Sequence, residues 1–162
     1  MYEFRKYIDD DSRKINALAL LSFTHFKPHY NDWDSFSRAL NKFSELSNVA
    51  EIIVATNSDD TIIGAVAYVP ANVTKADYFP KDTPIIRMLV VHPDYRGKGI
   101  GKSLSEACVN RAIRDSCKSI ALHTSAIMTV ALPMYLNMGF VKHSEAPDIF
   151  GVKYSVYVKD IA

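Results

Sequence analysis

A glycine-rich segment between an apolar stretch and a helical stretch constrains this chain more than any other part of its sequence. Residues 85–91 read Ile-Ile-Arg-Met-Leu-Val-Val, which is typical of a buried strand, and residues 104–112 have the apolar spacing of a helix. Between them, at alternate positions, lie Gly97, Gly99 and Gly101. Glycine adopts positive φ angles readily, so such a turn can direct successive N–H groups into one concavity. The start of the helix adds unpaired donors and a positive dipole end, and the segment therefore predicts a phosphate site.

The spacing of the glycines bears on which kind of phosphate site this is. A nucleoside-triphosphate loop would need a glycine in place of Arg96, five positions before Gly101. A dinucleotide loop that begins at Gly97 would need its third glycine in place of Lys102. Both patterns are near misses, although Lys98 and Lys102 supply the positive charge that a phosphate site favours.

A third pattern fits fully. The series Arg-x-x-Gly-x-Gly, formed by Arg96, Gly99 and Gly101, resembles the acyl-CoA pyrophosphate loop of the GCN5-related N-acetyltransferase (GNAT) family. Residues 131–140 are similar to the family's Ala-x-x-x-Tyr-x-x-x-Gly-Phe segment, with the tyrosine at Tyr135. Two motifs in the right order make the resemblance specific over residues 84–141, and the order of the expected elements extends it to the rest of the chain.

The resemblance implies a binding mode for acetyl-CoA. Backbone groups of Leu89, Val90 and Val91 would pair with the pantetheine arm, and the amide of Leu89 would meet the acetyl carbonyl. Tyr135 would protonate the departing CoA thiolate, which is chemically reasonable because a phenol is only slightly less acidic than an alkyl thiol. The residues implied to hold the pyrophosphate are Arg96, Gly97, Lys98, Gly99, Ile100, Gly101, Lys102 and Ser103.

The chain departs from the family pattern where the acceptor amine would be deprotonated. Ile85 stands where many members carry a glutamate base, and Met128 stands where an asparagine is common. His123 is a candidate base, although an ordinary surface or hydrogen-bonded histidine is the stronger interpretation. Arg87 within an apolar strand is expected to pair with an acid on a neighbouring element, with recognition of a substrate carboxylate as the second interpretation. The aromatic-rich stretch 23–33 could wall an acceptor pocket.

Length and composition predict one compact domain over residues 1–162, and the resemblance implies that it is an N-acetyltransferase domain. A net charge of +1 gives no electrostatic case for nucleic-acid or membrane partners, and no apolar run approaches the ~20 residues of a membrane span. Cys108 reads as a small buried hydrophobe, and the two cysteines lack metal-ligand spacing, so no metal is expected. We expect a cytoplasmic protein; a homodimer is suggested by the family resemblance alone.

The expected elements alternate in the order β-α-α-β-β-β-α-β-α-β-β, that of the resembled α/β fold. This fold has a central, mixed but mostly antiparallel sheet with helices on both faces. The expected strands are residues 2–7, 51–55, 61–69, 85–91, 119–124, 140–143 and 154–158. The expected helices are residues 12–23, about 32–47, 104–112 and 129–137.

Two functions follow from these observations. The first is an acetyl-CoA-dependent N-acetyltransferase that moves an acetyl group by direct attack of a primary amine, on a small molecule or a peptide not yet identified. The alternative is a non-catalytic acyl-CoA-binding or sensing module. The missing glutamate at Ile85 favours the alternative slightly, whereas Tyr135, useful only for a leaving thiolate, speaks against it.

Overall fold

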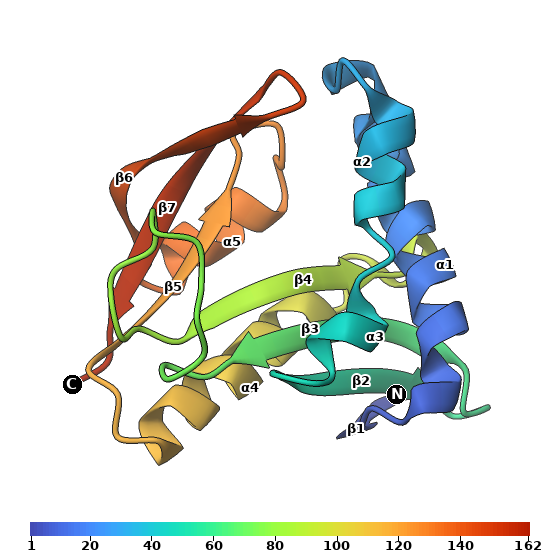
Figure 1. Ribbon diagram of the computed structural model, residues 1–162. Helices are drawn as coiled ribbons and strands as arrows, with labels where there is room; N and C mark the ends of the chain where they lie inside the picture. The colour runs from blue at the N-terminus through green and yellow to red at the C-terminus, as the bar shows by residue number, and fades with distance from the viewer.

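A computed structural model describes residues 1–162, and seven strands form one sheet in the order β1-β2-β3-β4-β5-β7-β6 (Figure 1). The strands are β1 (Tyr2–Lys6), β2 (Glu51–Asn57), β3 (Ile62–Val69), β4 (Ile85–Val91), β5 (Ser119–Thr124), β6 (Val141–Ile149) and β7 (Val152–Asp160). The α-helices are α1 (Ser12–Phe23), α2 (Trp33–Ala39), α3 (Phe43–Leu46), α4 (Ile100–Arg114) and α5 (Ala131–Asn137). Short 3₁₀ turns occupy Asp9–Asp11, Thr24–His29 and Pro93–Tyr95.

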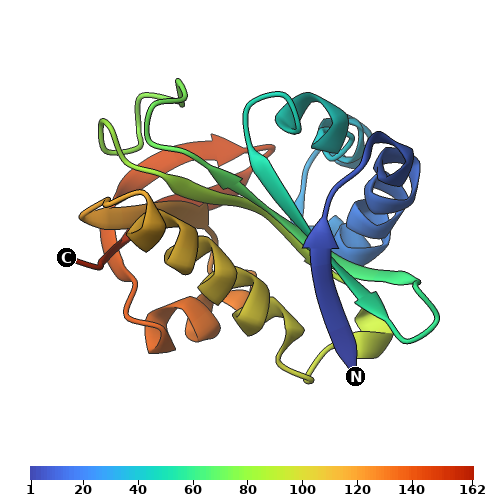
Figure 2. The same ribbon diagram turned by 90° about the horizontal axis from the view of Figure 1, so that it is seen from below.

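Every neighbouring pair of strands is antiparallel except β4 and β5, which are parallel. Figure 2 shows α1, α2 and α3 on one face of the sheet and α4 and α5 on the other. The expected fold, a mostly antiparallel mixed sheet with helices on both faces, is therefore confirmed. No helix is both long enough and apolar enough to cross a membrane.

Each face of the sheet carries its own core because side chains alternate along a strand. Along β2, Val54 joins Ile15 and Phe43 beneath α1 and α3, whereas Ile53 joins the core beneath α4. Cys108 is fully buried in that second core, as expected, and burial raises the pKa of its thiol to about 12. The thiol therefore stays protonated and packs as a hydrophobe.

Several expected elements differ from the structure in their bounds, and two of these differences have a clear physical reason. The second helix is broken rather than continuous from about 32 to 47, because Leu40 and Asn41 turn back to the carbonyls of Ser37 and Arg38. Asparagine is a weak helix former, since its side chain competes for backbone hydrogen bonds. Strand β6 runs six residues further than expected, to Ile149, although it contains Pro147. It lies at the edge of the sheet, where a proline removes no necessary ladder bond.

The centre of the sheet opens between β4 and β5. These parallel strands are in register only at Ile85 and Ala121, and Figure 1 shows them diverging beyond that point. The pairing of β4 with β3 also shifts, so that two residues of β4 have no partner between Arg87 and Val90. Met88 within this bulge has a positive φ of 56°. A bulge bends a strand and increases its twist, and it therefore helps to separate β4 from β5.

Candidate active site

The glycine-rich segment forms a tight turn that leads directly into α4. Gly97 and Gly99 have φ angles of 77° and 81°, which L side chains rarely adopt. The helix begins at Ile100, earlier than expected, because the Ser103 N–H already donates to the Gly99 carbonyl at 3.0 Å. The N–H groups of the first helical residues precede any intrahelical acceptor and are free to bind a ligand. Backbone donors and the positive end of the dipole thus meet at this turn.

The space around the turn suits a phosphate. A Cβ atom built on Gly97 or Gly99 would meet nothing within 4 Å, so both residues border open space. A Cβ atom on Gly101 would lie 3.6 Å from a Val91 methyl and 3.8 Å from Leu89, which are ordinary contacts. Gly97 and Gly99 therefore meet a conformational requirement, and Gly101 borders a side-chain-lined space.

A cleft of about 400 Å³ continues from the turn along β4. Its walls come from the end of α1, strand β4, the first turn of α4 and the approach to α5. The lining residues are Ser22, Phe23, His25, Phe26, Leu89, Val91, Tyr95, Arg96, Gly97, Gly99, Ile100, Gly101, Lys102, Met128, Thr129, Val130, Ala131 and Met134. The aromatic stretch 23–33 contributes Phe23, His25 and Phe26 to the wall of this cleft, and its role in an acceptor pocket stays a prediction.

The residues expected to bind acetyl-CoA lie around this cleft in different ways. Leu89 and Val91 line it with their side chains, whereas Val90 points to the opposite face and is buried there. Ile100 is 2% exposed, so the cleft is reached chiefly by its backbone. The Ser103 hydroxyl hydrogen-bonds the Tyr2 hydroxyl at 3.0 Å.

The three cationic side chains of the segment have different neighbours. The Arg96 guanidinium donates to the Ser22 carbonyl at 2.7 Å, and burial lowers its pKa. Arg96 therefore ties the end of α1 to the glycine turn. The Lys98 ammonium lies over the Tyr95 ring, 5.7 Å from its centroid, whereas Lys102 is exposed at the edge of the cleft.

This arrangement fits acetyl-CoA. A cradle of backbone N–H groups opens into a mostly apolar cleft, which matches a ligand whose pyrophosphate precedes a long, weakly polar arm. The open space at Gly97 and Gly99 lets the backbone approach a phosphate closely. No three His, Cys, Asp or Glu side chains cluster as they would around a metal ion.

Tyr135 lies beside the cleft but not on its surface. Its ring is 5% exposed and packs edge-on against Phe140, at 5.6 Å between ring centroids. Burial raises the pKa of its phenol, and a hydrogen bond with Ser105 of α4 opposes that shift. The preceding residue, Met134, lines the cleft. A catalytic role for Tyr135 therefore stays a prediction.

Arg87 and His123 differ from expectation. Arg87 is exposed and forms no ion pair, so the expected pairing with a neighbouring acid is wrong. The divergence of β4 from β5 lets water reach its side chain. His123 is neither a surface histidine nor a hydrogen-bonded one, because its Nδ1 is buried without a partner. Burial, and then the charge of Arg87, lower its pKa to about 4, so the imidazole is neutral at pH 7.

Sequence reasoning missed the aromatic residues that cover His123. The loop between β3 and β4 places Tyr78 and Phe79 at 5.7 and 5.4 Å from the imidazole, between ring centroids. Tyr154 of β7 lies on the same ring at 5.2 Å. Two adjacent aromatics in an otherwise polar, proline-rich loop were the available signal, because such side chains seek a hydrophobic surface.

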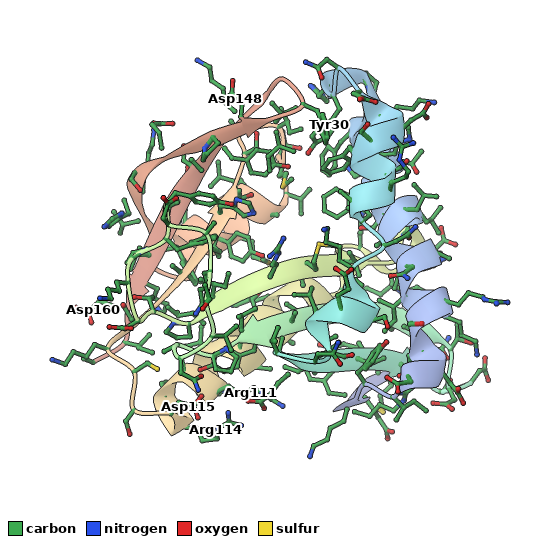
Figure 3. The ribbon with its side chains drawn as sticks, in the orientation of Figure 1. Tyr30, Arg111, Arg114, Asp115, Asp148 and Asp160 are labelled. Carbon is green, nitrogen blue, oxygen red and sulfur yellow. The ribbon has the colours of Figure 1, made fainter.

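Tyr154 also links the surroundings of His123 to the segment just before α2. Its hydroxyl is 2.5 Å from that of Tyr30, which is labelled near the hairpin of β6 and β7 in Figure 3. The same hairpin accepts a hydrogen bond from the Asn31 N–H at the Phe150 carbonyl, at 2.9 Å. The segment before α2 and the β6–β7 hairpin therefore meet across the open side of the sheet.

A charged cluster at the far end of α4 is separate from the cleft. Arg114 contacts Glu51 at 2.5 Å and Asp115 at 2.9 Å, and Arg111 contacts Glu51 at 3.2 Å. Figure 3 places Arg111, Arg114 and Asp115 together, at the end of α4 away from the glycine turn. The two ion pairs with Glu51 join α4 to β2, whereas the pair between Arg114 and Asp115 lies within the end of α4.

Known proteins share this sequence pattern and this fold. N-alpha-acetyltransferase 30 of Saccharomyces cerevisiae is 40% identical over 57 residues, which is 35% of this chain and 32% of the yeast protein. This chain thus matches about a third of that relative's length. PaiA N-acetyltransferase from Thermoplasma acidophilum, solved with coenzyme A, has a TM-score of 0.77 at 18% identity over 99% of both chains. The NatC complex bound to Gag peptide and CoA contains a chain with a TM-score of 0.70 at 19% identity, again over 99% of both chains.

The family profile agrees with the geometry of the site. The profile of the Acetyltransferase (GNAT) family matches residues 13–140, a range that contains the glycine turn and all of α5. It therefore spans the loop that could hold a pyrophosphate, the walls of the cleft and the diverging strands. With most of the sequence and the whole site inside that match, the chain belongs to the Acetyltransferase (GNAT) family.

Proposed function

We propose that the protein transfers the acetyl group of acetyl-CoA to a primary amine by direct attack. The observation that carries this proposal is the continuity of the site, because the cradle at Gly99 opens into a cleft that reaches β4 where β4 leaves β5. Acetyl-CoA supplies the activated acetyl group as a thioester. The protein would mainly hold the two reactants in order, and positioning of this kind can account for much of a barrier reduction.

Leu89 is the proposed oxyanion donor. Between the pairs Ala67–Arg87 and Ala65–Val90, β4 advances three positions and β3 only two, which leaves Leu89 within the bulge. Its side chain lines the cleft, so its backbone lies at the wall that the acetyl group would reach. A backbone N–H aimed at a developing negative charge is worth about 3–4 kcal/mol in known enzymes.

Tyr135 is the proposed acid for the leaving thiolate. Its support is its place in the family motif, together with its position one residue after cleft-lining Met134. Its raised pKa keeps the phenol protonated at neutral pH, as an acid requires. The Ser105 hydroxyl, which donates to the Gly101 carbonyl at 2.8 Å, sits between this phenol and the glycine turn.

We assign no dedicated base. Ile85 is 2% exposed and packs in the core where many relatives carry glutamate. A neutral His123 whose pKa is near 4 is a weak proton acceptor. The amine would therefore lose its proton to water before it attacks.

The acceptor is a primary amine of a small molecule or a peptide. The peptide option draws support from the similarity to an N-alpha-acetyltransferase and to a NatC chain solved with a peptide. The small-molecule option remains because identity to the solved structures is below 25%, where likeness concerns the fold.

Thioester turnover tests the proposal. Purified protein is mixed with acetyl-CoA and a panel of amines, and release of free CoA thiol is followed together with the mass of the acetylated amine. We expect amine-dependent release with a matching mass gain of one acetyl group. Tight CoA binding without turnover on any amine would support the alternative, a non-catalytic acyl-CoA-binding module.

A further inference from the structure

The opening between β4 and β5 has a second side, opposite the cleft. Ile85 and Ala121 are in register, and Arg87 and His123 each lie two positions further along their strands. They therefore flank the opening at the same level. Because side chains alternate along a strand, Arg87 and His123 project to the face that carries Ile85. The bulge at Met88 interrupts this alternation, so Leu89 projects to the other face and lines the cleft.

Arg87 places an unpaired positive charge on this side. Its side chain is exposed, and no acid forms an ion pair with it, including Asp77 of the neighbouring loop. The charge of Arg87 nevertheless acts on Tyr78 and His123. Burial is the larger influence on both, and it raises the pKa of Tyr78 and lowers that of His123. The positive charge of Arg87 lowers the pKa of each group.

The surroundings would strengthen an interaction with a bound anion. Tyr78, Phe79 and Tyr154 pack against the partly buried His123 ring and reduce its contact with water. Charge interactions grow as the local dielectric falls. The buried Nδ1 of His123 has no hydrogen-bond partner, and a neutral imidazole can donate one N–H. A buried polar atom without a partner is costly unless a ligand or water satisfies it.

We propose that Arg87 and His123 form a subsite for a carboxylate carried by the amine acceptor. The planar guanidinium would grip both carboxylate oxygens, as arginine does at other carboxylate sites, and a His123 N–H would add a donor. The acceptor is then an amino acid, or a peptide with an acidic group close to its reactive amine. This inference rests on the proposed acetyl transfer and narrows its substrate class.

The experiment compares acceptors that share an amine and differ by one charge. The pairs are β-alanine and β-alaninamide, γ-aminobutyrate and its amide, and two peptides with Glu or Gln at the second position. Each kcat/KM is normalised to the neutral amine present, because a carboxylate raises the pKa of a nearby amine. We expect at least one acid to exceed its amide by roughly 10- to 100-fold, the range of one charged hydrogen-bonded contact.

Three variants assign that preference. Arg87→Gln should bring the acid-to-amide ratio to about one and leave kcat/KM for the amides within a few fold. Arg87→Lys should restore part of the ratio. Lys118→Gln removes an exposed charge from the opposite end of β5 and should leave the ratio unchanged. A preference for the acid in the β-alanine or γ-aminobutyrate pair would indicate a small amino acid as acceptor, and one in the peptide pair would indicate an acidic peptide.

The outcomes separate this inference from the proposed function. Turnover of the amides with no preference for any acid would overturn the carboxylate subsite and leave acetyl transfer standing. Absence of turnover on every amine would overturn the proposed function, and the subsite would then be judged by binding. In that case N-acetyl-β-alanine is titrated while the His123 ring is followed by NMR. A shift that Arg87→Gln abolishes would support the subsite, and no shift would overturn it.

Discussion

At the scale of single residues, two glycines of the same turn differ in how strictly their positions require glycine. Gly99 has a φ of 81°, whereas Gly101 lies in the first turn of α4 with ordinary helical geometry. Gly99→Ala should strain the backbone by about 1–2 kcal/mol and weaken CoA binding. Gly101→Ala adds only contacts of 3.6 Å or more and should keep CoA affinity within a few fold. Calorimetric titration of both variants with CoA makes the comparison, and equal affinities would remove the conformational argument for Gly99.

Tyr135 separates packing from proton transfer. Tyr135→Phe keeps the ring against Phe140, so we expect CoA affinity and the urea unfolding midpoint to stay near wild type. Loss of a general acid typically costs about 10²–10⁴-fold in rate, and kcat should fall by that order. Steady-state kinetics on an acceptor with good turnover provide the measurement. Full activity in the variant would make Tyr135 a packing residue only.

The absence of a dedicated base should appear in the pH dependence. An alkyl amine with a pKa near 10.4 is less than about one part in a thousand neutral at pH 7, and only the neutral form attacks. His123, with a pKa of about 4, is already deprotonated above pH 6 and adds no limb there. We expect kcat/KM to rise about tenfold per pH unit past pH 8, in wild type and in His123→Ala alike. A plateau above pH 7 that disappears in His123→Ala would make His123 the base.

At the scale of elements, the sequence predicted those parts whose signals are local. The apolar run of β4 and the glycine turn were both identified because they depend on neighbouring residues. The bulge at Met88 was not, since it follows from how β4 pairs with β3. The exposure of Arg87 was missed for the same reason, because it depends on the divergence of β4 from β5.

The contact between α1 and the glycine turn gives an element-scale prediction. Arg96→Ala removes the charged hydrogen bond to the Ser22 carbonyl and should lower the free energy of unfolding by about 1.5–3 kcal/mol. CoA affinity should fall as well, because the end of α1 walls the cleft. Lys98→Ala is the matched control, because it removes a neighbouring cation that lies over Tyr95. It should lower the free energy of unfolding by about 1 kcal/mol at most. If urea unfolding gave the same loss of unfolding free energy for both variants, Arg96 would not stabilise the contact between α1 and the glycine turn.

At the scale of the whole molecule, most of the order of elements was predictable, whereas the part of the cleft beyond the glycine turn and β4 was not. Period and turn signals along the chain indicated the sequence of strands and helices that the structure contains, except that the expected second helix is divided into α2 and α3. The cleft, however, joins the end of α1 to residues around Met128 and Met134. Likewise, the aromatic side chains that pack on His123 come from the β3–β4 loop and from Tyr154 of β7. Contacts between such distant segments depend on tertiary packing, which no local pattern specifies.

One ion pair links the first strand to the first helix and should make the stability of the whole domain depend on acid pH. Asp11, 4% exposed, accepts from Arg5 at 2.8 and 3.0 Å and from the Ile8 N–H at 2.9 Å. The hydrogen bond to Arg5, above all, lowers the pKa of Asp11 below its usual 3.8. A lowered folded-state pKa means that the stabilisation is complete above the unfolded pKa, near 4, and disappears as pH falls through the folded value.

Asp11→Asn should therefore lower the free energy of unfolding by about 1–3 kcal/mol at pH 6, where the carboxylate of the wild type is ionised and fully bonded. Below about pH 4 unfolding of the wild type is accompanied by protonation of this carboxylate, which lowers its free energy of unfolding. The difference in unfolding free energy between wild type and Asp11→Asn should therefore shrink. Urea unfolding at pH 6, 5, 4 and 3, followed by the fluorescence of Trp33, the single tryptophan, measures both curves. Asp10→Asn, at an exposed neighbouring acid, should track the wild type throughout. A difference between Asp11→Asn and wild type that stayed constant down to pH 3 would show that Asp11 stabilises the junction of β1 and α1 by shape and not by its charge.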